Sequence, residues 1–279
     1  MNRTTITRTL AALSLALVAG AAHASDTTSS TTNLAESWTR DGNIVLHTRG
    51  LTLPSGKVAS SSTTTTRDGN TATKTGTFTL PDGETGTIAG KWQNTNGIIT
   101  GNTAYTAPNG ETVNRQTTIT KNGDITQREV VTTGPNGKTT THEDTWTKDG
   151  NTVNRTSSTT LPNGKTTSST SSTTKDGNTT TRTGTSTGPN GKSATSSDVW
   201  TRNGNTVNHT GTTTGANGKQ WQRQGTATKD GNTITRNGTQ TGPDGQTITT
   251  QSDVKKDGNT VTKDRTTTRK AKKSKRQAK

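Results

Sequence analysis

The sequence predicts an all-β protein made of tandem 27-residue β-hairpins that form an extended, twisted antiparallel meander. Glycine-centred turn dipeptides recur at a nearly fixed spacing along the chain. The runs between them are mostly Thr with some Val, Ile and Ser, which favour extended backbone. Only 20% of residues are hydrophobic and 3% aromatic, too few for a thick core. Such polarity also fits a disordered chain, but the regular turn spacing favours order.

The first segment is typical of a secretory signal peptide. Residues 1–8 carry two arginines and no acid, residues 10–22 are apolar, and Ala22-His23-Ala24 forms a small-x-small cleavage motif. We expect a signal peptide over residues 1–24 and an exported chain, periplasmic or extracellular, with no transmembrane segment after cleavage. An uncleaved membrane anchor is the alternative, although the apolar run is shorter than the roughly 20 residues a spanning helix needs. The chain has no cysteine, which excludes a lipid-anchor motif and disulfides.

A polar linker is expected over residues 25–35, followed by the hairpin array over residues 36–264. One set of turns is mostly Asp-Gly or Asn-Gly, which suits type I′ hairpin turns. The second is mostly Pro-Asn-Gly or Pro-Asp-Gly, which suits a type I turn closed by a glycine bulge. Together they divide the array into up to 18 short strands. The turn glycines are Gly42, Gly69, Gly97, Gly123, Gly150, Gly177, Gly204, Gly231 and Gly258 in the first set, and Gly56, Gly83, Gly110, Gly137, Gly164, Gly191, Gly218 and Gly245 in the second.

Two-residue Asp-Gly turns would fix which residues face each other across each hairpin. Cross-strand pairs of aromatic and β-branched residues stabilise a sheet, and this supports the register. A three-residue turn would shift the pairing by one residue. The expected pairs are Trp38 with Val45, Trp146 with Val153 and Trp200 with Val207.

Tryptophans recur at twice the basic period, with Trp221 outside the series. One interpretation is a row of rings that stack on sugars or bases. The other, which we favour, is a thin apolar stripe that packs one face of the sheet. Trp92 lies one residue further from its turn than the others, which predicts a β-bulge there. The residues are Trp38, Trp92, Trp146, Trp200 and Trp221.

Basic residues form two ladders at the repeat period. Stacking the repeats directly, as in a solenoid or an amyloid, would place like charges about 4.8 Å apart, so the ladders favour a meander. The first ladder is Lys74, Arg128, Arg155, Arg182, Arg236 and Lys263, completed by His47 and His209; the second is Arg40, Arg67, Lys121, Lys148, Lys175, Arg202, Lys229 and Lys256.

A basic block without acids ends the chain over residues 265–279. Such a block repels itself and is expected to be a disordered arm. Its predicted partners are anionic polymers of the envelope or matrix: lipopolysaccharide, acidic glycans or extracellular DNA. A merely solubilising tail is the alternative. Its cations are Arg265, Arg269, Lys270, Lys272, Lys273, Lys275, Arg276 and Lys279.

The alternating pattern of turns and strands in one stretch resembles the YD repeats of secreted Rhs-type bacterial proteins. The stretch runs Trp-Thr-Lys-Asp-Gly-Asn-Thr-Val-Asn-Arg-Thr over residues 146–156, followed by Leu-Pro-Asn-Gly-Lys over residues 161–165. The resemblance extends over about residues 36–264, but the Tyr-Asp pair is missing and the period differs. It implies a secreted scaffold or surface role.

No cofactor, metal or catalytic site is predicted, because the histidines are scattered and most aspartates belong to turns. We therefore expect a non-enzymatic exported protein: a repeat scaffold or adhesin-like surface whose basic tail binds anionic polymers. One alternative is a self-associating subunit of an amyloid-like matrix fibre. Another is a threonine-rich surface that binds glycans or ice.

Overall fold

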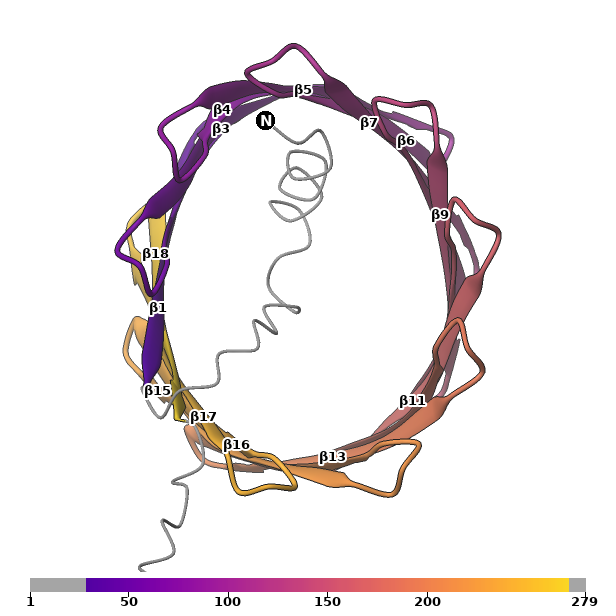
Figure 1. Cartoon of the computed structure of the whole chain (residues 1–279), viewed down its shortest axis with the longest axis vertical. Helices are drawn as coiled ribbons and strands as arrows, with labels where there is room; N and C mark the ends of the chain where they lie inside the picture. The colour runs from indigo at the N-terminus through magenta and orange to yellow at the C-terminus, as the bar shows by residue number, and fades with distance from the viewer. Residues whose placement is uncertain (1–28, 271–279) are drawn as a thin grey trace, which may run out of the picture.

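The computed structural model describes residues 29–270, which form eighteen antiparallel strands and the turns between them (Figure 1). The β-branched runs form strands and the glycine dipeptides form turns, as expected. The strands are β1 (Ser30–Asp41), β2 (Ile44–Thr52), β3 (Val58–Asp68), β4 (Thr71–Thr79), β5 (Thr85–Thr95), β6 (Ile98–Thr106), β7 (Thr112–Asn122), β8 (Ile125–Thr133), β9 (Thr139–Asp149), β10 (Thr152–Thr160), β11 (Thr166–Asp176), β12 (Thr179–Thr187), β13 (Ser193–Asn203), β14 (Thr206–Thr214), β15 (Gln220–Asp230), β16 (Thr233–Thr241), β17 (Thr247–Asp257) and β18 (Thr260–Lys270).

The meander is closed. Each strand pairs with the next, and β18 pairs in turn with β1, where Leu34 faces Arg265 and Trp38 faces Val261. The strands therefore form a complete ring around a central axis (Figure 1). The expected antiparallel hairpin meander is confirmed, whereas its expected extended shape is wrong, because pairing the two edges satisfies backbone groups that an open sheet leaves exposed.

The turns with proline form as expected at one end of the barrel. In the first of them, Gly56 N donates to Leu53 O at 2.9 Å and Leu53 N donates to Lys57 O at 2.9 Å. Gly56 has a φ of 79°, the left-handed conformation that a type I turn followed by a glycine bulge needs. Equivalent hydrogen bonds recur in the other turns at this end.

The turns at the opposite end correct the predicted register. The two turn residues of the first hairpin are Gly42 and Asn43, because Asp41 already pairs with Ile44. Gly42 alone has positive φ, at 53°, which matches a turn with glycine at its first central position rather than type I′. The three predicted tryptophan–valine pairs are therefore wrong: Trp38 faces His47, Trp146 faces Arg155 and Trp200 faces His209.

The hairpin of Trp92 has a different turn instead of the predicted bulge. Asn96 and Gly97 form the turn, both with positive φ (52° and 84°), as in type I′. Thr95 pairs with Ile98, and pairing continues without interruption from there. The extra residue before Gly97 is thus absorbed by moving the turn along the chain, which keeps the strands in register.

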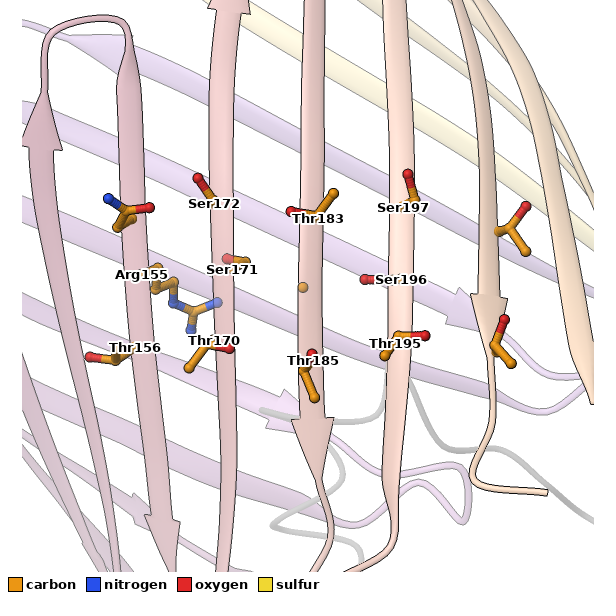
Figure 2. Close-up of a pocket in the computed structure, with 14 residues that line it drawn as sticks. Arg155, Thr156, Thr170, Ser171, Ser172, Thr183, Thr185, Thr195, Ser196 and Ser197 are labelled. Carbon is orange, nitrogen blue, oxygen red and sulfur yellow. The ribbon is translucent and has the colours of Figure 1, made fainter. Parts of the chain in front are cut away.

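Alternate side chains point into the barrel and away from it. Figure 2 views the wall across β10–β14 from outside: Thr156, Thr170 and Thr183 point outward, whereas Arg155 and Ser171 lie on the inner side. Cross-strand partners share a face, so the register of the paired strands assigns every strand residue to one side. Small side chains on both sides leave a shallow hollow of about 630 Å³ in this part of the wall.

Large and charged side chains lie mainly on the inner, concave face. Phe78 there is 1% exposed, and it packs with Leu80, Ile88 and Ala107 in the main apolar cluster of the described residues. Tyr105 and Val113 border this cluster. In a wall one sheet thick, such burial requires the concave side, where side chains converge.

The ends of the array extend beyond the expected limits. The strand β1 begins at Ser30, within the expected linker, and β18 ends at Lys270, within the expected disordered arm. Arg265, Arg269 and Lys270 are thus strand residues. The signal peptide and the five remaining tail cations (Lys272, Lys273, Lys275, Arg276 and Lys279) lie outside the described residues. Within residues 29–270, no helix is long and apolar enough to cross a membrane.

Candidate functional site

The interior of the ring is the candidate functional site. Eighteen strands spaced about 4.8 Å apart and tilted by about 40° enclose a circle about 35 Å across between backbones. Side chains from opposite walls are too short to fill that width, and barrels of 16–18 strands leave an aqueous channel. The side chains of the inner face therefore line a lumen.

The lumen is strongly positive. The register places nineteen lysines and arginines on the inner face of the strands, against three carboxylates, Glu36, Asp144 and Asp198. The outward face has the opposite sign, with ten carboxylates and three lysines (Lys91, Lys255 and Lys270). The luminal cations are Arg40, Arg49, Arg67, Lys74, Arg115, Lys121, Arg128, Lys148, Arg155, Lys175, Arg182, Arg202, Arg223, Lys229, Arg236, Lys256, Lys263, Arg265 and Arg269.

Both basic ladders of the sequence lie on this luminal face. The ladder from Arg40 to Lys256 belongs to odd-numbered strands, next to the glycine–asparagine turns, and so surrounds one mouth of the barrel. Aspartates at the ends of these strands, such as Asp41 and Asp68, lie on the outward side of the same mouth. The ladder from Lys74 to Lys263 belongs to even-numbered strands and lies deeper in the lumen.

Asp144 is the most buried charged group of the described barrel, with a side chain that is 0% exposed. Arg128 Nε donates to it at 3.0 Å and Arg155 Nε at 2.9 Å, from the strands on either side. His142 Nε2 lies 3.0 Å from the same carboxylate. Both guanidinium groups also lie over the Trp146 ring, 5.4 and 5.5 Å from its centroid. The luminal wall therefore already holds one oxyanion group between two arginines.

Glu36 and Asp198 repeat this arrangement in other parts of the wall. Asp198 accepts from Arg223 Nε at 3.1 Å and lies 2.9 Å from His209 Nε2. Glu36 accepts from Lys263 Nζ at 2.7 Å and forms a longer ion pair with Arg49 at 3.5 Å. These carboxylates each precede a tryptophan by two residues.

All five predicted tryptophans lie on the luminal face and are half-buried. Trp38 stacks on His47 and Trp200 on His209, each with ring centroids 4.7 Å apart. Trp92 covers Gly101, where a Cβ would lie 2.2 Å from the ring. The rings contact neighbours on the wall, and both the favoured packing role and the alternative of stacking on a ligand stay predictions.

The closed ring resembles solved porin structures. A triple mutant of Rh. blastica porin matches with a TM-score of 0.55 and 9% identity, covering 88% of this chain and 99% of that one. The barrel has a porin-like fold. Another triple mutant of the Rhodopseudomonas blastica porin matches at a TM-score of 0.54 and 8% identity, with the same coverage. No family model and no curated protein sequence matches the chain.

The porin-like barrel overturns several predictions. The resemblance to YD repeats is wrong, because the hairpins form a closed barrel similar to porins. An adhesin-like scaffold and an amyloid-like fibre are contradicted, since the β1–β18 seam leaves no open edge within residues 29–270. A glycan- or ice-binding surface needs flat threonine rows, and this wall is curved. The predicted anionic-polymer partners are also wrong, since Arg265 and Arg269 of the supposed arm line the lumen in β18.

The outward face of the barrel is rich in threonine. All outward positions of β4 and β12 are Thr, and outward threonine pairs such as Thr39–Thr260 and Thr152–Thr174 hydrogen-bond at 3.1 and 2.9 Å. The described strands direct no aromatic side chain outward. This composition differs from the apolar band and aromatic girdles of transmembrane barrels. The outward apolar residues are Ala35, Ile44, Leu46, Val58, Ala89, Ile98, Ala104, Ile125, Val131 and Val199.

Sequence reasoning recognised the basic ladders and paired Glu36, Asp144 and Asp198 with His47, Arg155 and His209, but it did not predict that all of them face one lumen. The 54-residue spacing of the three carboxylates, which the tryptophans share, was a signal for a common face. Histidines and acids do not gather further, since residues 29–270 contain no group of three or more His, Cys, Asp or Glu that could hold a metal ion. That the protein is not an enzyme stays a prediction.

Proposed function

We propose that the chain forms a water-filled pore in a bacterial outer membrane and that this pore favours small anions over cations. The observation that supports the proposal is the closed ring of eighteen antiparallel strands whose lumen carries nineteen cations and three carboxylates. Outer-membrane barrels have an even number of antiparallel strands joined by short turns on at least one side. A lumen of one charge sign raises the local concentration of counter-ions.

The proposal also requires export across the inner membrane, which the predicted signal peptide over residues 1–24 supplies. In a closed barrel, every strand satisfies its backbone groups against its neighbours, which is the condition for spanning a bilayer with strands. The porin-like fold is consistent with this placement.

The test is conductance in a planar bilayer that separates two KCl solutions of different concentration. We expect open channels and a reversal potential of the sign that chloride-selective conduction gives. Replacing luminal Lys121, Lys148 and Lys175 with Glu should shift that potential towards cation selectivity. The same replacement of outward Lys91, Lys255 and Lys270 is the control and should leave it unchanged. A folded barrel that never conducts contradicts the pore, and a cation-selective wild type contradicts the anion preference.

The threonine-rich outward face favours a second candidate: a barrel that stays in water and holds small anions in its lumen. Outward carboxylates such as Glu129 and Glu143, which face each other across β8 and β9, are costly in lipid and cost little in water. Flotation with phospholipid vesicles separates the two candidates. A pore co-floats with the vesicles, whereas a water-borne barrel stays at the bottom of the gradient and is monodisperse without detergent.

A further inference from the structure

The wall of the lumen repeats one position every 54 residues, and its occupants differ. The five positions are Glu36, Gly90, Asp144, Asp198 and Ser252. Each lies on the luminal face next to at least one cation of a neighbouring strand. Three supply a carboxylate that the cations bind. At Gly90, the Trp92 ring lies 3.0 Å from where a Cβ would be, so the ring covers the wall there.

Ser252 differs from the other four positions. It faces Arg236 on β16 and Arg265 on β18, so two arginines flank it. Arg236 corresponds in the repeat to Arg128 beside Asp144. The residue two positions further is Val254, which provides no ring to cover the wall. Arg236 is therefore kept from the acid-binding arrangement, while the carboxylate is replaced by a hydroxyl. The second arginine is new: Arg265 lies opposite Ser252, where Ser157 lies opposite Asp144.

The polar atoms at this position lack partners. Ser252 is 6% exposed, and neither its Oγ nor the buried Nε of Arg265 has a hydrogen-bond partner within the described residues. Arg236, which is exposed to the lumen, forms no ion pair with any residue in the range 29–270. Lys263, the next luminal cation on β18, is bound to Glu36 at 2.7 Å. Buried polar groups are normally hydrogen-bonded, so the unpaired Ser252 Oγ and Arg265 Nε need an acceptor that the described strands do not supply.

We propose that Arg236, Ser252 and Arg265 form a binding site for a small oxyanion, such as phosphate or a carboxylate, in the wall of the lumen. Guanidinium groups bind planar and tetrahedral oxyanions through paired N–H donors, and the serine hydroxyl adds a third donor. The bound anion takes the place that the Asp144 carboxylate has between Arg128 and Arg155. The site depends on the folded sheet and not on conduction, because the adjacent strands β16, β17 and β18 provide it.

The test is a calorimetric titration that measures equilibrium binding of inorganic phosphate to the folded full chain. Acetate and chloride are titrated in the same way. Wild type should bind phosphate or acetate in preference to chloride at equal ionic strength. Ser252→Asp supplies an internal carboxylate and should lower the affinity by about tenfold or more, because the two arginines then bind that carboxylate instead of the ligand. Arg236→Gln should have a similar effect.

The matched control is Arg182→Gln. Arg182 has the same repeat position as Arg236, faces Asp198 in the register and donates to Ser171 Oγ at 3.4 Å. Its loss removes the same luminal charge while Arg236, Ser252 and Arg265 stay intact. We expect phosphate affinity to stay within about twofold of wild type. Equal affinities of wild type and Ser252→Asp, equal losses in Arg182→Gln and Arg236→Gln, or no preference over chloride would each overturn the proposal. None of these results depends on bilayer conductance.

Discussion

The two faces of the barrel wall have the same backbone and nearly opposite chemistry. Adjacent residues of β9 illustrate the difference: Asp144 is fully buried between two arginines, whereas Glu143 is exposed on the outward side and faces Glu129. Inward positions hold the aromatic rings, almost all cations and the apolar cluster; outward positions hold mainly threonine. The curvature of the barrel, rather than a thick core, therefore creates its buried environment.

The largest effect should come from removing the luminal carboxylate. Asp144→Ala leaves Arg128 and Arg155 without their shared partner, and breaking a buried ion pair costs about 3–5 kcal/mol. The neighbouring Glu143→Ala should change the free energy of unfolding by no more than about 0.5 kcal/mol. Urea unfolding of both variants measures the contrast. Similar losses in both would mean that the two faces do not differ in the way described.

Glycine substitutions should give the next largest contrast. A Cβ on luminal Gly86 would lie 2.2 Å from Phe78 Cζ and 2.4 Å from the Thr106 carbonyl. Gly86→Ala should therefore cost about 1–3 kcal/mol through overpacking. Outward Gly50 has no atom within 4 Å of such a Cβ and an ordinary φ, so Gly50→Ala should be neutral or stabilise by about 0.4–1 kcal/mol. Thermal unfolding of both variants measures the contrast in stability. A Gly50→Ala variant less stable than wild type would contradict the assignment of faces.

The smallest effect on stability, but an informative one, is expected from threonine replacement. Changing the outward threonines of β4 (Thr71, Thr73, Thr75, Thr77 and Thr79) to Val should shift the free energy of unfolding by at most about 0.5 kcal/mol per site. Each lost hydroxyl makes transfer into lipid easier by about 0.5–2 kcal/mol, so the fraction that co-floats with vesicles should rise.

The control for this variant is on the luminal face. Changing Ser169, Ser171 and Thr173 of β11 to Val should leave flotation unchanged, because these side chains do not meet lipid. Equal flotation of the two variants would show that the outward face does not contact the bilayer.

Much of the fold is predictable because turn chemistry is local. Each glycine dipeptide marks its own turn, so the number of strands and their antiparallel order follow from the sequence. The exact pairing does not follow, because Asp-Gly-Asn offers two choices of central residues and the structure uses Gly42 and Asn43. Closure does not follow either, since it depends on a fit between β1 and β18 that no local pattern encodes.

The site was harder to predict than the fold. Both faces of the strands are polar, so alternation alone does not indicate which face becomes concave. The ladders of Arg40 and Lys74 were visible as repeats, but their placement around a common lumen requires the closed ring. The position of Ser252 becomes informative only when it is compared with Asp144 and Asp198 in the same wall.

The β1–β18 seam also determines how the barrel can be assembled. Residues that pair across it, such as Thr39 and Thr260, are 221 residues apart in the chain. All the other strand pairs join strands that are consecutive in the sequence. Closing such a long loop is entropically expensive and slows folding, so the ring is completed only after the last strand has been synthesised. Because Ser30 and Arg269 face each other across the seam, a short linker could join β18 to β1, and new termini could be opened at another proline turn. Such circular permutants should retain the same ring.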